Sequence, residues 1–168
     1  WQGCKDKPDP EPEVLVQDGI LVLNEGNYLS GNASLSFEDA EGAVTPDVYK
    51  SASQLPLGDV AQSMALAEGD LFVVVNNSGK LLRLDLPSLD QVCATQGLLS
   101  PRHFQSISPT KAYISDLYSR TITILNPSTC SVTGQIATGG WTEEMLVLGS
   151  KCYVAQTGTD KLLVINTT

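Results

Sequence analysis

Short apolar runs separated by polar turns fill this chain from residue 14 onward, and part of the pattern repeats. Phe72, Tyr113 and Tyr153 each lie in a short, mainly apolar run that is followed by a polar turn and a second apolar run. These aromatic residues are 41 and then 40 residues apart. A repeat of roughly 40 residues built only from short strands is typical of a β-propeller, in which one repeat forms one blade.

The repeat predicts an all-β fold, a β-propeller in which residues 14–168 form about four blades, the last without its outer strand. The strand signal that ends the first blade runs from Ala43 to Tyr49, and no segment keeps a helical period beyond a single turn. Because an unclosed propeller exposes strand edges, we expect these blades to be the N-terminal half of a closed ring. Residues 1–13 are charged and spaced by prolines, which predicts a tether outside the packed fold.

The acidic composition narrows the classes of partner. The net charge is −9, and the ten Lys and Arg residues are scattered along the chain. A nucleic-acid-binding domain needs clustered basic residues to contact phosphates, so this class is excluded. No apolar run reaches the roughly 20 residues of a membrane-spanning helix. We therefore expect contact with a membrane only through a lipid anchor.

Residues that could support catalysis or bind a metal are sparse. His103 is the one histidine and no Cys-x-x-Cys pair occurs, so neither a metal site nor a cofactor is predicted. A nucleophile with a general base would need an acid to orient His103, and the sequence shows no obvious one. Glu143 and Glu144 are adjacent, so in a strand their side chains point to opposite faces and cannot act as a pair. We expect a protein that is not an enzyme.

The four cysteines lead to two expectations. Cys4 follows Gly3 and precedes the charged tether, as in the processing site of a bacterial lipoprotein, in which the cysteine carries the lipid; an incidental thiol is the alternative. The other three cysteines allow at most one internal disulfide. Cys130 and Cys152 lie in neighbouring blades toward the same end and are the expected pair, while three unpaired thiols remain an equal possibility.

One face of the propeller is the expected binding site. In a four-stranded antiparallel blade, the turn between the second and third strands and the link to the next blade emerge on the same face. Loops on a rigid scaffold that carry aromatic, amide and Arg side chains suit a large polar ligand, although aromatic residues also pack between blades and Arg102 could form a salt bridge there. The candidate ligand-binding residues are Asn24, Asn27, Tyr28, Asn76, Asn77, Arg102, Asp116, Tyr118, Trp141 and Thr142. We assign the repeated aromatics Phe72, Tyr113 and Tyr153 to the core between blades.

Several motifs of this face occur in an order that resembles a known family. They are Asn24-Glu25-Gly26-Asn27, Pro56-Leu57-Gly58-Asp59-Val60-Ala61-Gln62-Ser63, Val75-Asn76-Asn77-Ser78-Gly79-Lys80, Ser100-Pro101-Arg102 and Ala112-Tyr113-Ile114-Ser115-Asp116. This part of the chain resembles the surface β-propeller lipoproteins of Bacteroidetes, which belong to the YncE-like, YVTN-repeat class. The resemblance implies a seven-bladed ring with a lipid anchor at Cys4 on the bacterial cell surface.

The same resemblance implies a function. The best-known members of that class bind cobalamin at the outer membrane and cap a TonB-dependent vitamin B12 transporter. The chain is therefore expected to bind a cobalamin-type corrinoid and deliver it to such a transporter. The alternatives are capture of a ferric siderophore or another nutrient by the same architecture, a structural or adhesion propeller, and an enzyme of the lactonase or quinoprotein type, for which the sequence offers no metal ligands or cofactor site.

Overall fold

The computed structural model describes residues 16–168, so Cys4 and the expected tether lie outside the described residues. Four antiparallel sheets follow one another along the chain. The first contains β1 (Gly19–Asn24), β2 (Ser34–Asp39) and β3 (Val44–Thr45), and the second β4 (Ala61–Ala67), β5 (Asp70–Val75), β6 (Lys80–Leu84) and β7 (Gln91–Thr95). The third contains β8 (Pro101–Ser108), β9 (Lys111–Asp116), β10 (Thr121–Asn126) and β11 (Ser131–Ala137), and the fourth β12 (Trp141–Leu148), β13 (Lys151–Thr157) and β14 (Lys161–Asn166).

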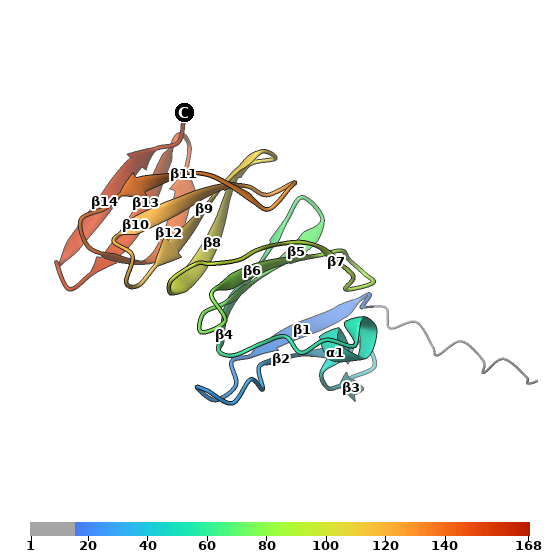
Figure 1. Cartoon of the computed structure of the whole chain (residues 1–168). Coiled ribbons are helices and arrows are strands. Elements are labelled where there is room, and N and C mark those ends of the chain that lie inside the picture. The colour runs from blue at the N-terminus through green and yellow to red at the C-terminus, as the bar shows by residue number, and fades with distance from the viewer. Residues whose placement is uncertain (1–15) are drawn as a thin grey trace, which may run out of the picture.

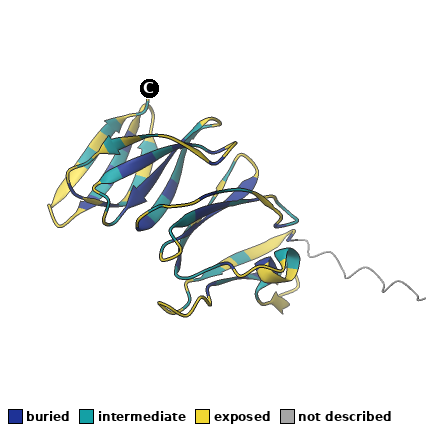
Figure 2. Cartoon of the chain, in the orientation of Figure 1, coloured by how far each residue is buried: buried dark blue, intermediate teal, exposed yellow. Residues whose placement is uncertain are grey.

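The sheets stack face to face as the blades of a propeller (Figure 1), which confirms the predicted fold class. Along the inner side of the stack, β8 contacts both β4 and β12. The middle strands are the most deeply buried, and every residue of β5 is buried (Figure 2). The two faces of such a strand pack against the two neighbouring blades. Because both faces are buried, the strand is a continuous apolar run in the sequence. The last blade has three described strands, as predicted.

Two of the three repeated aromatic residues lie between described blades, as expected, whereas Tyr153 lies on the outward face of the fourth blade. Phe72 of the second blade stacks on Phe104 of the third, with ring centroids 4.2 Å apart and an interplanar angle of 5°. Tyr113 is buried between the third and fourth blades in a cluster with Ile122 and Val154. A repeated aromatic residue thus lies in each of the two interfaces between the last three blades.

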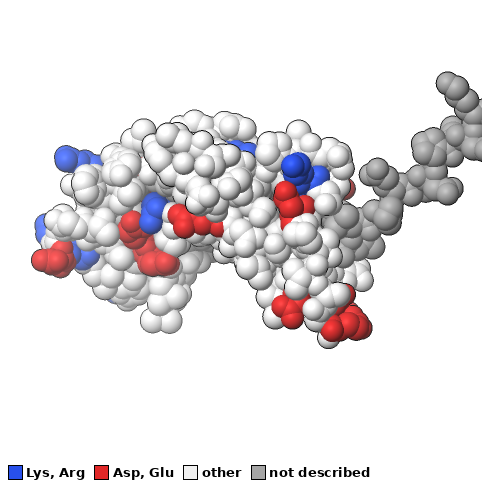
Figure 3. Space-filling model, turned by 90° about the horizontal axis from the view of Figure 1, so that it is seen from below, with Lys and Arg blue, Asp and Glu red and all other residues white. Residues whose placement is uncertain are grey.

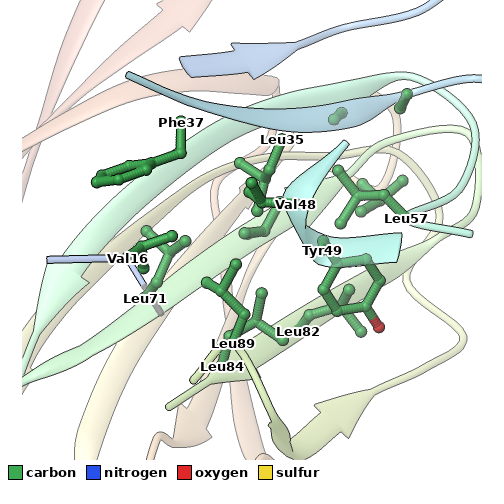
Figure 4. Close-up of a cluster of buried hydrophobic side chains, with 14 residues drawn as sticks. Val16, Leu35, Phe37, Val48, Tyr49, Leu57, Leu71, Leu82, Leu84 and Leu89 are labelled. Atoms are coloured by element: carbon green, nitrogen blue, oxygen red, sulfur yellow. The ribbon is translucent and has the colours of Figure 1, made fainter. Parts of the chain in front are cut away.

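The predicted strand from Ala43 to Tyr49 is wrong at its end, because the helix α1 (Val48–Ser53) occupies this segment. Val48 and Tyr49 point into the core between the first and second blades, where they pack with Leu35 and Leu82 (Figure 4). Two adjacent apolar residues fit a short strand and one turn of a helix equally well, and tertiary packing decides between them.

The expected disulfide between Cys130 and Cys152 is also wrong. Cys93 of β7 bonds to Cys130, with their Cα atoms 5.9 Å apart, and Cys152 is a buried free thiol. Cys152 lies on β13, with its side chain in the core between the third and fourth blades, whereas Cys130 lies in the turn before β11, next to the outer strand of the second blade. Burial raises the pKa of the Cys152 thiol. The disulfide thus joins the second blade to the third.

Loss of this disulfide should destabilise the fold. It closes a loop across 37 residues, and a bridge of this span stabilises a protein by about 2–4 kcal/mol, mainly by restricting the unfolded chain. We expect the double variant Cys93→Ser/Cys130→Ser to unfold at a lower guanidinium concentration than the parent protein. Adding reductant should shift the parent curve onto that of the variant. A Cys152→Ala variant that loses this response to reductant would contradict the Cys93–Cys130 pairing.

Candidate functional site

The turns and links that were expected to share one face do meet there. The turn before β6 contacts the link between β7 and β8, where the Leu98 amide donates to the Gly79 carbonyl at 2.9 Å. A Cβ atom on Gly79, whose φ is +57°, would lie 2.4 Å from the Leu98 carbonyl oxygen, so only glycine permits this approach. One blade further, the Thr138 amide donates to the Arg120 carbonyl at 3.0 Å. We call this side, formed by the turns before β2, β6, β10 and β14 and the links before β4, β8 and β12, the loop face.

Asp116 holds the loop face together from within. Its carboxylate is buried and accepts backbone N–H bonds from Ser100 at 2.8 Å, Tyr118 at 2.9 Å and Ser119 at 2.8 Å. Its backbone N–H donates to the hydroxyl of buried Thr142 at 3.0 Å, so the fourth blade is tied to the same point. Both Asp116 and Thr142 are candidate ligand residues, and the structure places both beneath the surface.

The candidate amides also make contacts within the fold. Asn76 donates to the Ser100 hydroxyl and the Pro101 carbonyl of the next blade, and Asn77 donates to the Asp59 carboxylate at 2.6 Å. Asn24 donates to two serine hydroxyls on β2. The backbone of Asn27 donates to the side chain of Asn32 at 2.7 Å. The side-chain amides of Asn24, Asn76 and Asn77 therefore fix the loops in place and present few free donors to a ligand.

The aromatic candidates differ, because they remain at the surface. The side chains of Tyr118 and Trp141 are 57% and 42% exposed and meet edge to face, with ring centroids 5.7 Å apart. Tyr28, on the turn before β2, is exposed as well. Tyr118 and Trp141 come from the third and fourth blades, so the loop face brings together two aromatic rings that are separated in sequence.

A small open cavity lies beside Trp141 between the third and fourth blades. It measures about 190 Å³ and is lined by Arg120, Gly139, Gly140, Trp141, Thr157, Gly158 and Thr159. Among the described residues, no hydrogen bond or ion pair uses the Arg120 guanidinium, which leaves it available to an anion. Sequence reasoning missed Arg120. Its place in the turn before β10, two residues after Tyr118, is the signal that could have identified it.

Arg102 lies instead in a polar cluster on the inner strands. Its guanidinium donates to Glu143 at 2.7 Å and also to Gln62, and the Nε2 atom of His103 lies 3.3 Å from Glu144. These side chains join β4, β8 and β12, so the cluster lines the inner side of the stack. Arg102 thus forms the salt bridge between blades that was the alternative to ligand contact.

This cluster corrects two expectations: that no acid lies beside His103, and that Glu143 and Glu144 point to opposite faces. Acids do lie beside His103, since the second carboxylate, that of Glu143, is 3.9 Å from Nε2. The two glutamates approach the same ring because the pairing of β12 with β13 shifts register between Thr142 and Met145, which breaks the strict alternation of side chains. Along residues 16–168, no Ser, Thr or Cys side chain is hydrogen-bonded to the imidazole, and no group of three His, Cys, Asp or Glu side chains is placed to hold a metal ion.

Charge on the molecule is mixed and local. Seen from below in Figure 3, basic and acidic side chains lie in small neighbouring groups on a mostly uncharged surface. Burial lowers the pKa of Lys80, which begins β6 beside the link before β4. No helix within residues 16–168 is long and apolar enough to cross a membrane. The side shown contains no basic patch.

The fold and the loop face define the chain as a β-propeller. The profile of the domain family DUF5074, described as a domain of unknown function, matches residues 18–168, and the chain belongs to that family. Among curated proteins, none matches the chain.

Solved structures share the fold at low sequence identity. The dihydro-heme d1 dehydrogenase NirN in complex with DHE is 14% identical, with a TM-score of 0.63 over 96% of this chain and 34% of that one. BamB from Moraxella catarrhalis is 16% identical, with a TM-score of 0.58 over 89% and 46%. A protein from Bacteroides uniformis, provisionally assigned as a 6-phosphogluconolactonase, is 14% identical, with a TM-score of 0.58 over 88% and 50%. The chain spans about a third to a half of the length of these three structures, and the likeness concerns the fold alone.

Proposed function

We propose that this propeller is a non-catalytic binding protein that captures a cobalamin-type corrinoid on its loop face. The observation that carries the proposal is the exposed edge-to-face pair of Tyr118 and Trp141 beside the cavity with Arg120. Exposed aromatic residues on loops of a rigid scaffold bind ligands with little loss of side-chain entropy. Here the scaffold is made rigid by the hydrogen bonds that Asp116 and Asn76 make to the following blade or its link.

The chemistry of the site fits a large ligand with both apolar and polar edges. The rings of Tyr118 and Trp141 can pack on the ring system of a corrinoid, and the Arg120 guanidinium can bind its phosphate through charge-assisted hydrogen bonds. The cavity of about 190 Å³ is smaller than the roughly 300–1,000 Å³ of a small-molecule pocket. These four blades would therefore contact part of the ligand, and further blades of a closed ring would contact the rest.

The proposed setting is the bacterial cell surface. Cys4 would carry the lipid, residues 1–13 would form the tether, and the propeller would pass its ligand to a TonB-dependent transporter in the outer membrane. Two or more acyl chains anchor a protein stably, and a tether of this composition leaves the propeller free to swing. The support is the position of Cys4 after Gly3 and the resemblance of the loop motifs to surface lipoproteins.

Variants of the aromatic pair test the site. We expect Tyr118→Ala and Trp141→Ala each to weaken binding of cyanocobalamin by roughly tenfold, which corresponds to about 1.4 kcal/mol of lost contact. Titration calorimetry on the lipid-free protein measures both affinities. Val132→Ala is the matched control, because it removes an exposed side chain from the outer strand β11 and should leave the affinity unchanged.

The outcomes separate the alternatives. Affinity that is unchanged in both aromatic variants would contradict the loop-face site. A protein that ignores cyanocobalamin but binds a ferric siderophore, with the same sensitivity to Tyr118→Ala, would keep the site and replace the ligand. A protein that binds neither class would favour a structural or adhesion role.

A further inference from the structure

The fourth blade lacks a carboxylate that the third blade uses to hold its turn on the loop face. In the third blade, the buried Asp116 carboxylate accepts the backbone N–H groups of Tyr118 at 2.9 Å and Ser119 at 2.8 Å. The corresponding residue of the fourth blade is Gln156, because each of the two follows the repeated tyrosine of its blade by three positions. A neutral amide therefore replaces the carboxylate at the same place in the repeat.

This replacement leaves backbone donors free in the fourth blade. Gly158 and Thr159 lie two and three residues after Gln156, as the two donors to the carboxylate do after Asp116. The Gln156 amide has other partners, since it donates to the Thr138 carbonyl at 2.8 Å and accepts the Thr159 hydroxyl at 2.8 Å. Within residues 16–168, no hydrogen bond uses the backbone N–H of Gly158 or Thr159. Both residues line the small cavity between the third and fourth blades, so the donors that an anion satisfies in the third blade are unpaired there.

Arg120 adds a cation to the same cavity from an unfavourable backbone position. It has a φ of +56° and immediately precedes β10, as Gly79, with a φ of +57°, immediately precedes β6. A residue with a Cβ atom adopts this left-handed conformation less readily than glycine, and strain of this kind clusters at functional sites. The Arg120 guanidinium has no partner within the described residues, and it is the one charged group among the side chains that line the cavity.

The size and the donors of the cavity suit an oxyanion. Its volume of about 190 Å³ is several times the roughly 30 Å³ that a water molecule takes in the liquid, which is enough for a phosphate group. Although the chain carries a net charge of −9, no carboxylate lines this cavity. A guanidinium binds an oxyanion through charge-assisted, often paired hydrogen bonds, and successive backbone N–H groups form a concave site for anions.

We propose that this cavity is an oxyanion site that takes a phosphate group, with Arg120 and the backbone N–H groups of Gly158 and Thr159 as its donors. The phosphate supplies from outside the negative charge that Asp116 supplies within the third blade. The site binds inorganic phosphate and selects larger ligands that carry a phosphate ester. Selection among corrinoids rests on the function proposed above, because cyanocobalamin carries a phosphodiester that cobinamide lacks. The anion site itself does not depend on that function.

Calorimetric titration of inorganic phosphate at constant ionic strength tests the site. We expect saturable binding at one site per chain, and Arg120→Gln should weaken it by tenfold or more. Lys151→Gln is the matched control, because it removes an exposed cation from the opposite end of β13 and should leave the affinity for phosphate unchanged. Absence of saturable binding at millimolar phosphate, or equal affinity in Arg120→Gln and the parent protein, would overturn the proposal.

Substitution of Gln156 tests the backbone donors. Gln156→Asp restores the carboxylate of the third blade, which should accept the N–H groups of Gly158 and Thr159 itself and weaken phosphate binding by tenfold or more. Gln156→Asn shortens the side chain in the same way without adding charge, so it should retain most of the affinity. Far-UV circular dichroism establishes that both variants are folded. Equal affinity for phosphate in the folded Gln156→Asp variant and the parent protein would contradict the assignment of these donors.

A comparison of two corrinoids separates this inference from the proposed function. We expect the parent protein to bind cyanocobalamin at least tenfold more tightly than cobinamide, and Arg120→Gln to remove most of that difference. Phosphate binding at Arg120 without any binding of cyanocobalamin would keep the oxyanion site and overturn the corrinoid function. Binding of cyanocobalamin without phosphate binding would do the reverse. Equal affinities of the parent protein for the two corrinoids would overturn the selection of phosphate-bearing ligands.

Discussion

Replacing Asp116 by alanine should lower the free energy of unfolding by about 3–5 kcal/mol, because three backbone N–H groups would lose one shared acceptor and each unsatisfied buried donor costs about 1–3 kcal/mol. The carboxylate binds the amides of Ser100, Tyr118 and Ser119, which belong to a link and a turn of the loop face. Chemical denaturation followed by circular dichroism measures the change. Because Tyr118 is held by this network, the same variant should also bind the ligand more weakly.

Two further variants make the Asp116 result specific. Asp116→Asn keeps one carbonyl oxygen as an acceptor and should lose less stability than Asp116→Ala. Asp90→Ala removes an exposed aspartate whose side chain makes no hydrogen bond within the described residues, and it should change stability by less than about 0.5 kcal/mol. Equal stability of Asp116→Ala and the parent protein would show that the loop face is held by other contacts.

Replacing Phe72 by alanine should have a comparable effect, about 3–5 kcal/mol, because it leaves a large cavity between the second and third blades. The Phe72 ring is almost fully buried and stacks on Phe104 at 4.2 Å, so the variant loses both the buried area and the aromatic contact. Thermal and chemical denaturation measure the loss.

The repeat supplies the control for this prediction. Tyr153→Ala should lower the free energy of unfolding much less than Phe72→Ala. The two residues share a repeat position, but within the described residues no following blade covers Tyr153. Equal losses in the two variants would contradict the interpretation that burial between blades, and not the position within a blade, stabilises the fold.

The propeller itself could be predicted from the sequence because each blade repeats the same local pattern. The spacing of Phe72, Tyr113 and Tyr153 depends on interfaces that are alike, so it reports the fold without any knowledge of long-range contacts. The gathering of turns and links on one face followed from the antiparallel order of the strands. The contact of Tyr118 with Trp141 is a direct result of that order.

The features that the sequence did not predict depend on departures from the repeat. In the first blade the strand β3 is only two residues long and α1 follows it, and the two buried residues of this helix carry no period of their own. The disulfide joins Cys93 to Cys130 because an outer strand lies beside a turn of the next blade, which spacing along the chain does not reveal. The approach of Glu143 and Glu144 to His103 depends on a shift of register in β12.

For the candidate site, too, the sequence could predict some features and not others. Asn76 lies in a turn, while Asp116 ends β9 and Thr142 lies at the start of β12, and residue type could not show that their polar groups would be used within the fold. Tyr118 and Trp141 are exposed because no neighbouring loop among residues 16–168 covers their rings. For polar residues, the distinction between holding a loop and binding a ligand depends on geometry between blades.

The most direct test of the central claim is calorimetric titration of cyanocobalamin into the lipid-free protein. The proposed function predicts saturable binding with a defined stoichiometry, weakened by Trp141→Ala and unaffected by Val132→Ala. Absence of binding heat up to high micromolar cyanocobalamin, with the protein folded by circular dichroism, would contradict the corrinoid assignment.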